Sequence, residues 1–192
     1  MKQLFLIVVF SLFSITNSCA WFKLTINGFV DENDESKNYI VFSVPDMSQE
    51  DLYNGVLKFI MSNYKSPKDV VSELKPEMLT INGYKPSCIS LAENNKMYAM
   101  GVYDMNYTVT IRFKDGKIRF DAPYFECTNT TSNKKNRLVL TGSNGGFGPE
   151  VLVGLFNKKG NPSRKHAIAN LENHFNSFCS KILKSITVEN DW

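Results

Sequence analysis

The most regular hydrophobic pattern in the chain lies near its C-terminus. Apolar side chains recur there at alternating intervals of three and four residues, at Ile168, Leu171, Phe175, Phe178, Ile182 and Ile186. This spacing places them on one stripe of an α-helix. Asn161 followed by Pro162 is a typical helix start, because asparagine caps free amides and proline suits the first turn. We therefore predict a long amphipathic helix over residues 162–186 that packs on a core.

A second helix is expected directly after Ser48. Ser48 with Asp51 three residues later has the form of a capping box, in which two side chains satisfy free amides at the helix start. Apolar side chains then follow on one helical stripe at Leu52, Val56, Phe59 or Ile60, and Tyr64. Ser66 and Pro67 predict the end of this helix, since the residue before a proline avoids helical geometry.

The other periodic segments alternate every second residue, as strands do. Residues 21–30 alternate loosely, and we interpret the acidic stretch 31–35 as a solvated turn. Residues 39–44 form a β-rich run that a proline closes. Further β-rich runs follow over residues 78–127, and another over residues 137–141.

The clearest strand pair is a hairpin over residues 107–122. Asp-Gly at 115–116 separates two alternating segments, which is a strong signal for a two-residue hairpin turn. Along the first arm, apolar side chains at odd positions alternate with polar ones at Thr108, Thr110 and Arg112. One face of the hairpin is therefore expected to be buried, and the other to face water or a ligand.

These elements follow one another as strand, helix, about four antiparallel strands and helix, a β-α-β4-α order. The pattern predicts an α+β fold in which a curved antiparallel sheet packs against two helices. We expect one domain over residues 37–187, preceded by a strand and acidic turn at 21–36 and followed by a tail at 188–192. A chain of this size buries a core without needing disulfides.

The first twenty residues have the three-part layout of a signal peptide. Lys2 precedes an apolar run over residues 4–13, and small and polar residues follow. The run has about ten residues, whereas a permanent membrane helix needs roughly 20. We therefore expect removal of residues 1–20, no transmembrane span in the mature protein, and a secreted or periplasmic location.

Two processing routes remain open at the end of this segment. Ser18 and Ala20 form a small-x-small cleavage site before Trp21. Cys19 offers the alternative of an acylated lipoprotein cysteine, which would anchor the protein to a membrane. Either route removes Lys2, so 21 of the 22 basic side chains remain against 19 acidic ones. Such a balanced, scattered charge gives no case for nucleic acid as a partner.

Three cysteines are left once Cys19 is removed or acylated. Cys88 and Cys127 both fall in predicted strands and are the expected disulfide pair in an oxidising compartment, with three buried thiols as the alternative. Cys179 lies beside Phe175 and Phe178 on the apolar stripe of the last helix, which favours a role in packing.

No metal site, cofactor or catalytic group stands out. His166 and His174 are eight residues apart on the last helix, which is not the one-turn spacing of a helical zinc pair, and we expect both at the surface or its boundary. A hydrolase using Cys179 with either histidine is the enzymatic alternative, and it requires an exposed thiol with a lowered pKa.

Aromatic side chains are the remaining candidates for ligand contact. Most of them lie in the predicted sheet, and one more lies in a glycine-rich loop over residues 142–149. This loop lacks the glycine spacing of phosphate-binding motifs. If the sheet or the loop binds a ligand, the residues expected to contact it are Tyr98, Tyr103, Tyr124 and Phe147.

Three segments resemble one known family. Residues 47–66, MSQEDLYNGVLKFIMSNYKS, look like its first helix, while Ile81-Asn82-Gly83 and the hairpin YTVTIRFKDGKIR over 107–119 look like its later strands. This is the bacterial envelope family called domain of unknown function 4468, and the resemblance extends over roughly residues 37–125. It implies a TATA-binding-protein-like (TBP-like) fold and transfers no catalytic residues. After Ala122 a long insertion departs from the family, which leaves the strand count open.

The sequence therefore favours an exported, non-enzymatic envelope domain. It is expected to bind a small apolar ligand, a peptide or a protein partner through its sheet face or its glycine-rich loop. A purely structural envelope protein remains an alternative that the residues do not separate from this one.

Overall fold

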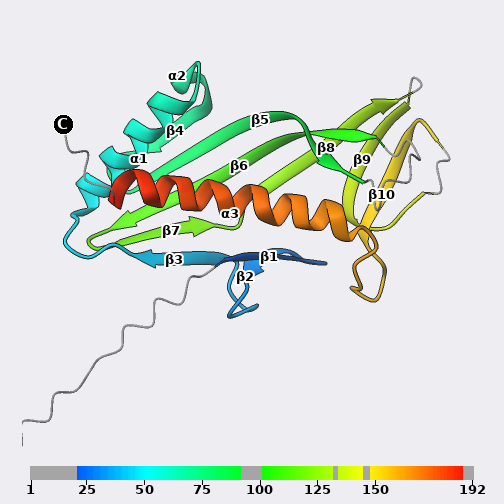
Figure 1. Ribbon diagram of the computed structural model, residues 1–192, viewed down its shortest axis with the longest axis horizontal. Coiled ribbons are helices and arrows are strands. Elements are labelled where there is room, and N and C mark those ends of the chain that lie inside the picture. The colour runs from blue at the N-terminus through cyan, green and yellow to red at the C-terminus, as the bar shows by residue number, and fades with distance from the viewer. Residues whose placement is uncertain (1–20, 92–100, 132–133, 145–147, 188–192) are drawn as a thin grey trace, which may run out of the picture.

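The computed structural model describes residues 21–91, 101–131, 134–144 and 148–187 (Figure 1). The predicted signal peptide and tail lie outside these residues, as do Cys19, Tyr98 and Phe147. The described helices are α1 (Gln49–Asn63), α2 (Pro67–Val70) and α3 (Lys165–Thr187). The described strands are β1 (Phe22–Thr25), β2 (Gly28–Asp31), β3 (Tyr39–Ser43), β4 (Val71–Leu74), β5 (Met78–Ser90), β6 (Val102–Lys114), β7 (Lys117–Asp121), β8 (Tyr124–Thr131), β9 (Lys134–Thr141) and β10 (Glu150–Phe156).

The main sheet is organised around β6. This strand pairs with β5 along one edge, and its other edge is shared by β7 and β8. The sheet continues outward to β4 on one side and through β9 to β10 on the other, while β3 pairs with β7. Every pairing is antiparallel except that of β10 with β9. The long strands bend in Figure 1, and the expected α+β class with a curved, largely antiparallel sheet is confirmed.

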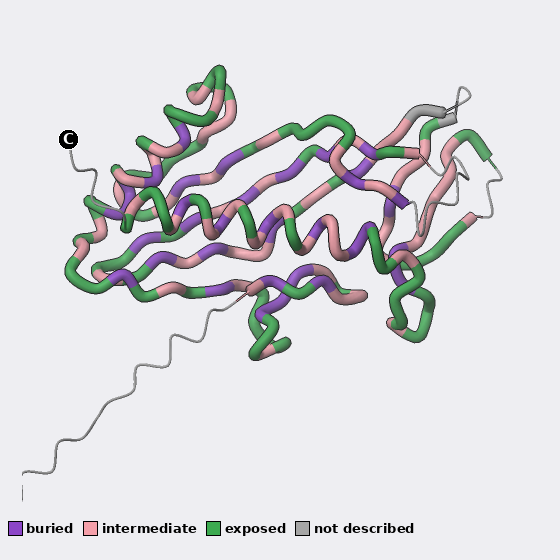
Figure 2. The backbone as a smooth tube through the Cα atoms, in the orientation of Figure 1, coloured by how far each residue is buried: buried purple, intermediate pink, exposed green. Residues whose placement is uncertain are grey.

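The two long helices lie together on one face of this sheet (Figure 1). Buried positions alternate along the central strands and follow one side of α3 (Figure 2). Ile81 and Ile111 from the sheet are fully buried, as is Ile60 of α1, and Phe175 of α3 is almost fully buried. Full burial of each such side chain contributes about 1.5–3 kcal/mol. The apolar stripes predicted for both helices are therefore the ones that build the core.

The start of α1 has the serine half of the predicted capping box. The Ser48 hydroxyl accepts the Asp51 amide at 3.1 Å and donates to the Asp51 carboxylate at 2.6 Å. The start of α3 differs from the prediction, because the helix begins at Lys165 and not at Pro162. The Asn161 carbonyl accepts the Asn157 amide, and Pro162 forms a β-bridge with Phe156, so pairing with β10 overrides the local helix signal.

The N-terminal segment was expected to be one strand and is instead a hairpin of β1 and β2. The Thr25 hydroxyl donates to the Gly28 carbonyl across a turn that begins at Ile26. The outer edge of β1 contacts α3, where Asn176 exchanges two hydrogen bonds with the Phe22 backbone at 2.9 and 3.0 Å. The side chain of Asn176 thus forms the hydrogen bonds that another strand would otherwise form with the backbone of β1.

Candidate functional site

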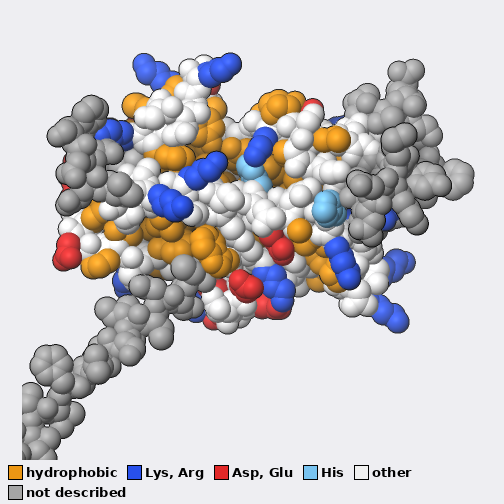
Figure 3. Space-filling view, viewed as in Figure 1, with side chains coloured by type: hydrophobic (Ala, Val, Ile, Leu, Met, Phe, Trp, Pro, Cys, Tyr) orange, Lys and Arg blue, Asp and Glu red, His pale blue; other side chains and the backbone are white. Residues whose placement is uncertain are grey.

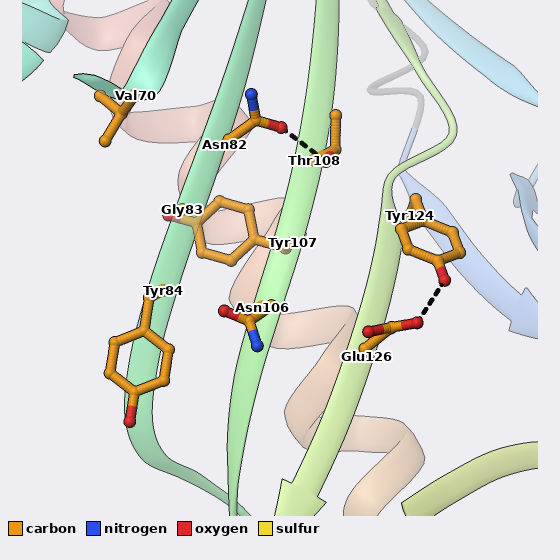
Figure 4. Close-up of a pocket in the computed structure, with 9 residues that line it drawn as sticks. All are labelled: Val70, Asn82, Gly83, Tyr84, Asn106, Tyr107, Thr108, Tyr124 and Glu126. Carbon is orange, nitrogen blue, oxygen red and sulfur yellow. Dashed lines mark hydrogen bonds between the residues drawn. The ribbon is translucent and has the colours of Figure 1, made fainter. Parts of the chain in front are cut away.

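The candidate site lies on the sheet face opposite the long helices. Successive residues of a strand point to opposite faces, so the buried odd positions of β6 leave Asn106 and Thr108 on the outer face. Neighbouring strands add Asn82 and Tyr84 from β5, and Tyr124 and Glu126 from β8. A hollow of about 320 Å³ opens among these side chains (Figure 4). Its lining is Val70, Asn82, Gly83, Tyr84, Asn106, Tyr107, Thr108, Tyr124 and Glu126.

The strand register arranges these side chains in two rows across three strands. Tyr84 pairs with Asn106, which pairs with Glu126, and these three form one row. Asn82, Thr108 and Tyr124 form the second row in the same way. Adjacent strands are about 4.8 Å apart, so each row spans roughly 10 Å. The hollow is therefore a short, flat-bottomed trough with one exposed tyrosine in each row.

Hydrogen bonds hold several of these side chains in place (Figure 4). The Thr108 hydroxyl donates to Asn82 Oδ1 at 2.8 Å, and the Tyr124 hydroxyl donates to Glu126 Oε1 at 2.7 Å. The Tyr84 hydroxyl donates to Asp104 Oδ2 at 2.9 Å. The aromatic rings themselves remain available, because Tyr84 is 59% exposed and Tyr124 is 62% exposed.

The floor of the hollow is tied to the helices through Tyr107. Gly83 and Tyr107 are directly paired, and a Cβ atom on Gly83 would overlap the Tyr107 ring. The ring therefore lies flat across the glycine and packs against Phe175 of α3, with ring centroids 5.8 Å apart. The Tyr107 hydroxyl is hydrogen-bonded to the Tyr64 hydroxyl at 3.0 Å, at the end of α1. A rigid base of this kind keeps the outer side chains in register.

The charge in and beside the hollow is negative. The Ser87 amide and the Tyr84 hydroxyl bond to the Asp104 carboxylate and hold its pKa below the usual value, so Asp104 is ionised at neutral pH. The same bond raises the pKa of Tyr84, which stays a neutral donor. Among the residues that the structure describes, neither Asp104 nor Glu126 has a cationic side chain within ion-pair distance.

Of the four predicted ligand contacts, the structure describes Tyr103 and Tyr124. Tyr124 lines this hollow. Tyr103 is 3% exposed on the inner face of β6 and does not line it. Tyr98 and Phe147 fall outside the described residues.

The sequence reasoning missed Tyr84, Asn82 and Asn106. The alternation of apolar and polar residues along β5 and β6 indicates which side chains lie on the outer face. The strand register was also needed to show that these side chains adjoin Glu126.

A larger hollow of about 620 Å³ adjoins the first one. It lies between the β1–β2 hairpin and the strands β8 and β9, and it shares Tyr124 and Glu126 with its neighbour. Its other lining residues include apolar side chains such as Ile26, Phe29 and Leu138. The ring of Tyr124 therefore borders both hollows.

The cysteines differ from the predicted pairing. Cys88 and Cys127 are free thiols in the structure. They belong to β5 and β8, and β6 lies between these strands, which separates the two Cα atoms by about 10 Å. A disulfide needs Cα atoms within about 7 Å. Burial raises the pKa of the Cys127 thiol, as expected for a packing residue.

The alternative Cys-His site lacks a reactive thiol. Cys179 is buried on the inner stripe of α3, and this burial raises its pKa far from the range of a nucleophile. His166 is exposed, and burial lowers the pKa of His174 to about 4. Within the described ranges, no three His, Cys, Asp or Glu side chains are placed to hold a metal ion. None of the helices described is long and apolar enough to cross a membrane.

Comparisons with known proteins agree with this architecture. Residues 39–127 match the family model described as "Domain of unknown function (DUF4468) with TBP-like fold". The crystal structure of a TBP-like protein from Parabacteroides distasonis ATCC 8503 is similar, with a TM-score of 0.50 and 10% identity over 77% of this chain and 90% of that chain. That of a DUF4468 family protein from Bacteroides ovatus ATCC 8483 has a TM-score of 0.46 and 14% identity over 80% and 87%. None of the curated proteins matches the chain. The family match and the first structure confirm the expected resemblance and fold.

Proposed function

We propose that this chain, whose residues 39–127 form a DUF4468 domain with a TBP-like fold, is an exported, non-enzymatic binding domain that holds a peptide segment of a protein partner. The observation that carries the proposal is the trough on the outer sheet face. There, two exposed tyrosine rings flank amide and hydroxyl groups that the strand register aligns.

The side chains of the trough favour a peptide over a small apolar molecule. Tyrosine, asparagine, threonine and glycine dominate the lining, and surfaces of this composition bind proteins well. Tyrosine offers a large ring at low entropy cost, and the amides adapt their hydrogen bonds to a partner. Two rows about 7 Å apart along the strands accommodate two or three side chains of a bound segment.

The charge of the trough narrows the class of peptide. Asp104 and Glu126 accept hydrogen bonds from neutral tyrosine hydroxyls, and neither forms an ion pair with a described lysine or arginine. A lysine or arginine of the bound segment would supply compensating positive charge through hydrogen bonds to a carboxylate. The preferred ligand is therefore a basic, polar peptide.

Two further features support the exported, non-enzymatic part of the proposal. The first twenty residues have the layout of a signal peptide, and the mature protein then begins next to β1. The buried thiol of Cys179 lends no support to a hydrolase. Mass spectrometry of the protein from its native cells tests export directly. A mature N-terminus at Trp21 or at an acylated Cys19 is expected, and an intact Met1 would contradict it.

Selection from a random peptide library tests the binding function. The mature domain is immobilised, and the bound peptides are compared on a Tyr84→Ala/Tyr124→Ala variant and on a Val41→Ala control. Val41 is 40% exposed on β3 and does not line the trough. We expect basic peptides that bind the wild type and the control equally and bind the double variant at least about tenfold more weakly, because interface tyrosines are typical hot spots. Peptides that bind the double variant as tightly as the wild type would refute the proposal, and so would a selection that enriches no peptide.

A further inference from the structure

A second polar hollow lies on the helix side of the molecule, between β5 and α3. Its volume is about 350 Å³. Its lining is Lys85, Cys88, Asn170, Asn173, His174, Ser177, Phe178 and Lys181. Among the described residues, no carboxylate belongs to this lining. Figure 3 shows this face of the molecule, where lysine and arginine side chains lie near its middle and acidic ones gather mainly toward the β1–β2 hairpin.

Two lysines from different elements bring positive charge to this hollow. Lys85 of β5 places its ammonium nitrogen 3.3 Å from Nδ1 of His174, and Lys181 lies further along α3. Both lysines disfavour protonation of His174 electrostatically. Neither forms an ion pair with an acidic residue in the described part of the chain. The described lining thus holds two cationic side chains and no anionic one.

The imidazole of His174 is fixed in one tautomer by this arrangement. An ammonium group only donates hydrogen bonds, so Nδ1 of His174 accepts from Lys85 and the ring proton lies on Nε2. The ring packs against Tyr107 and Phe175, with centroid distances of 5.3 and 4.9 Å. Burial and the two lysines lower the pKa of His174 to about 4, so the ring is neutral at physiological pH.

Asp104 is the acidic side chain that acts on the hollow from its rim. Its carboxylate raises the pKa of Cys88 electrostatically, so it lies near this thiol of the lining. However, one of its oxygens accepts the Ser87 amide at 2.7 Å and the other accepts the Tyr84 hydroxyl at 2.9 Å. Asp104 does not belong to the lining of the hollow, whereas both lysines do, so the described lining keeps a net positive charge.

We propose that this hollow binds a small divalent oxyanion, such as phosphate or the head of a phosphate ester, between Lys85 and Lys181. Lysine ammonium groups are common phosphate ligands in proteins. Asn173 and Ser177 are exposed on the same side of α3 and add neutral donors. Asn170 accepts the Ser90 amide through its oxygen, so its NH2 group is the donor end of that side chain. The site is separate from the peptide trough and does not rest on the function proposed for it.

Titration of the mature domain with inorganic phosphate, followed by NMR, tests this site. We expect saturable binding with a dissociation constant below about 1 mM, and about tenfold weaker binding in Lys85→Ala and in Lys181→Ala, since each loses a charge-assisted hydrogen bond. Lys165→Ala is the matched control, because Lys165 is exposed at the other end of α3 and does not line the hollow. Bound phosphate should also raise the pKa of His174, because a nearby negative charge favours the protonated imidazole. Circular dichroism confirms that each variant is folded.

A vesicle arm of the same experiment identifies the source of the oxyanion. Binding to phosphatidylglycerol vesicles that is lost in both lysine variants would assign the site to a lipid headgroup. Phosphate binding without vesicle binding would assign it to a soluble phosphate compound. Phosphate binding that is absent, or that the two lysine variants weaken no more than Lys165→Ala does, would overturn the proposal.

Discussion

Replacement of Gly83 by alanine probes the support beneath the peptide trough. The new Cβ atom would overlap the Tyr107 ring, so the ring has to leave its position across β5. Forcing such a shift in a packed core costs about 1–3 kcal/mol. The hydrogen bond between the hydroxyls of Tyr107 and Tyr64 is lost as well, at about 1 kcal/mol. Alanine in a strand stabilises the folded state by about 0.5–1 kcal/mol relative to glycine, which offsets part of this cost. The expected net loss of stability is about 2 kcal/mol.

A double-mutant cycle isolates the contact responsible. Urea denaturation followed by circular dichroism gives the free energy of unfolding of the wild type, Gly83→Ala, Tyr107→Val and the double variant. Valine keeps a strand-forming residue while it removes the ring. In the Tyr107→Val background, Gly83→Ala should be neutral or stabilising by about 0.5 kcal/mol, because the three atoms nearest to the new Cβ atom all belong to the Tyr107 side chain and have been removed. An equal cost of Gly83→Ala in both backgrounds would refute the reasoning.

Three other predictions concern the core, the histidine and the thiols. Phe175→Ala should lower the free energy of unfolding by about 3–5 kcal/mol in urea titrations, because it removes a ring that joins α3 to the sheet; a loss under about 1 kcal/mol would contradict the packing described. His174 has a folded-state pKa of about 4, against 6.5 for an unperturbed histidine. As the pH falls from 6.5 to about 4, the unfolded chain therefore protonates this imidazole before the folded chain does, and the free energy of unfolding decreases. His174→Gln should therefore flatten the pH profile of stability in that window, and an unchanged profile would count against a neutral buried ring. Because Cys88 and Cys127 are free, dithiothreitol should leave the thermal midpoint of the mature protein unchanged, whereas a lower midpoint would reveal a disulfide.

The elements with strong local signals were predictable from the sequence. The stripe of α3, the Ser48 cap and the Asp-Gly hairpin all depend on residues close together in the chain, and each has its expected form. The start of α3 is an exception, because a competing local turn overrides the helix signal. Asn161 and Pro162 resemble a helix start, yet they pair with the end of β10.

The candidate site was less predictable than the fold. Tyr103 and Tyr124 were both expected to contact a ligand, yet they lie on opposite faces of the sheet, because composition alone does not show which sheet face a residue occupies. The odd positions of β6 face the helices, and Tyr103 is one of them. Tyr84 and Glu126 come together only through the pairing of three strands, one of which departs from regular register after Lys85. A single sequence carries little information on such registers.

The central claim is that the outer sheet face, and not the helix face, holds the partner. Site-specific photo-crosslinking with a selected basic peptide tests it most directly. A photoreactive benzoylphenylalanine replaces Tyr84, Tyr124 or, as the control, Lys58 on the exposed side of α1. We predict a crosslinked adduct from the first two positions and none from Lys58. Adducts from Lys58 with none from either tyrosine position would contradict the account.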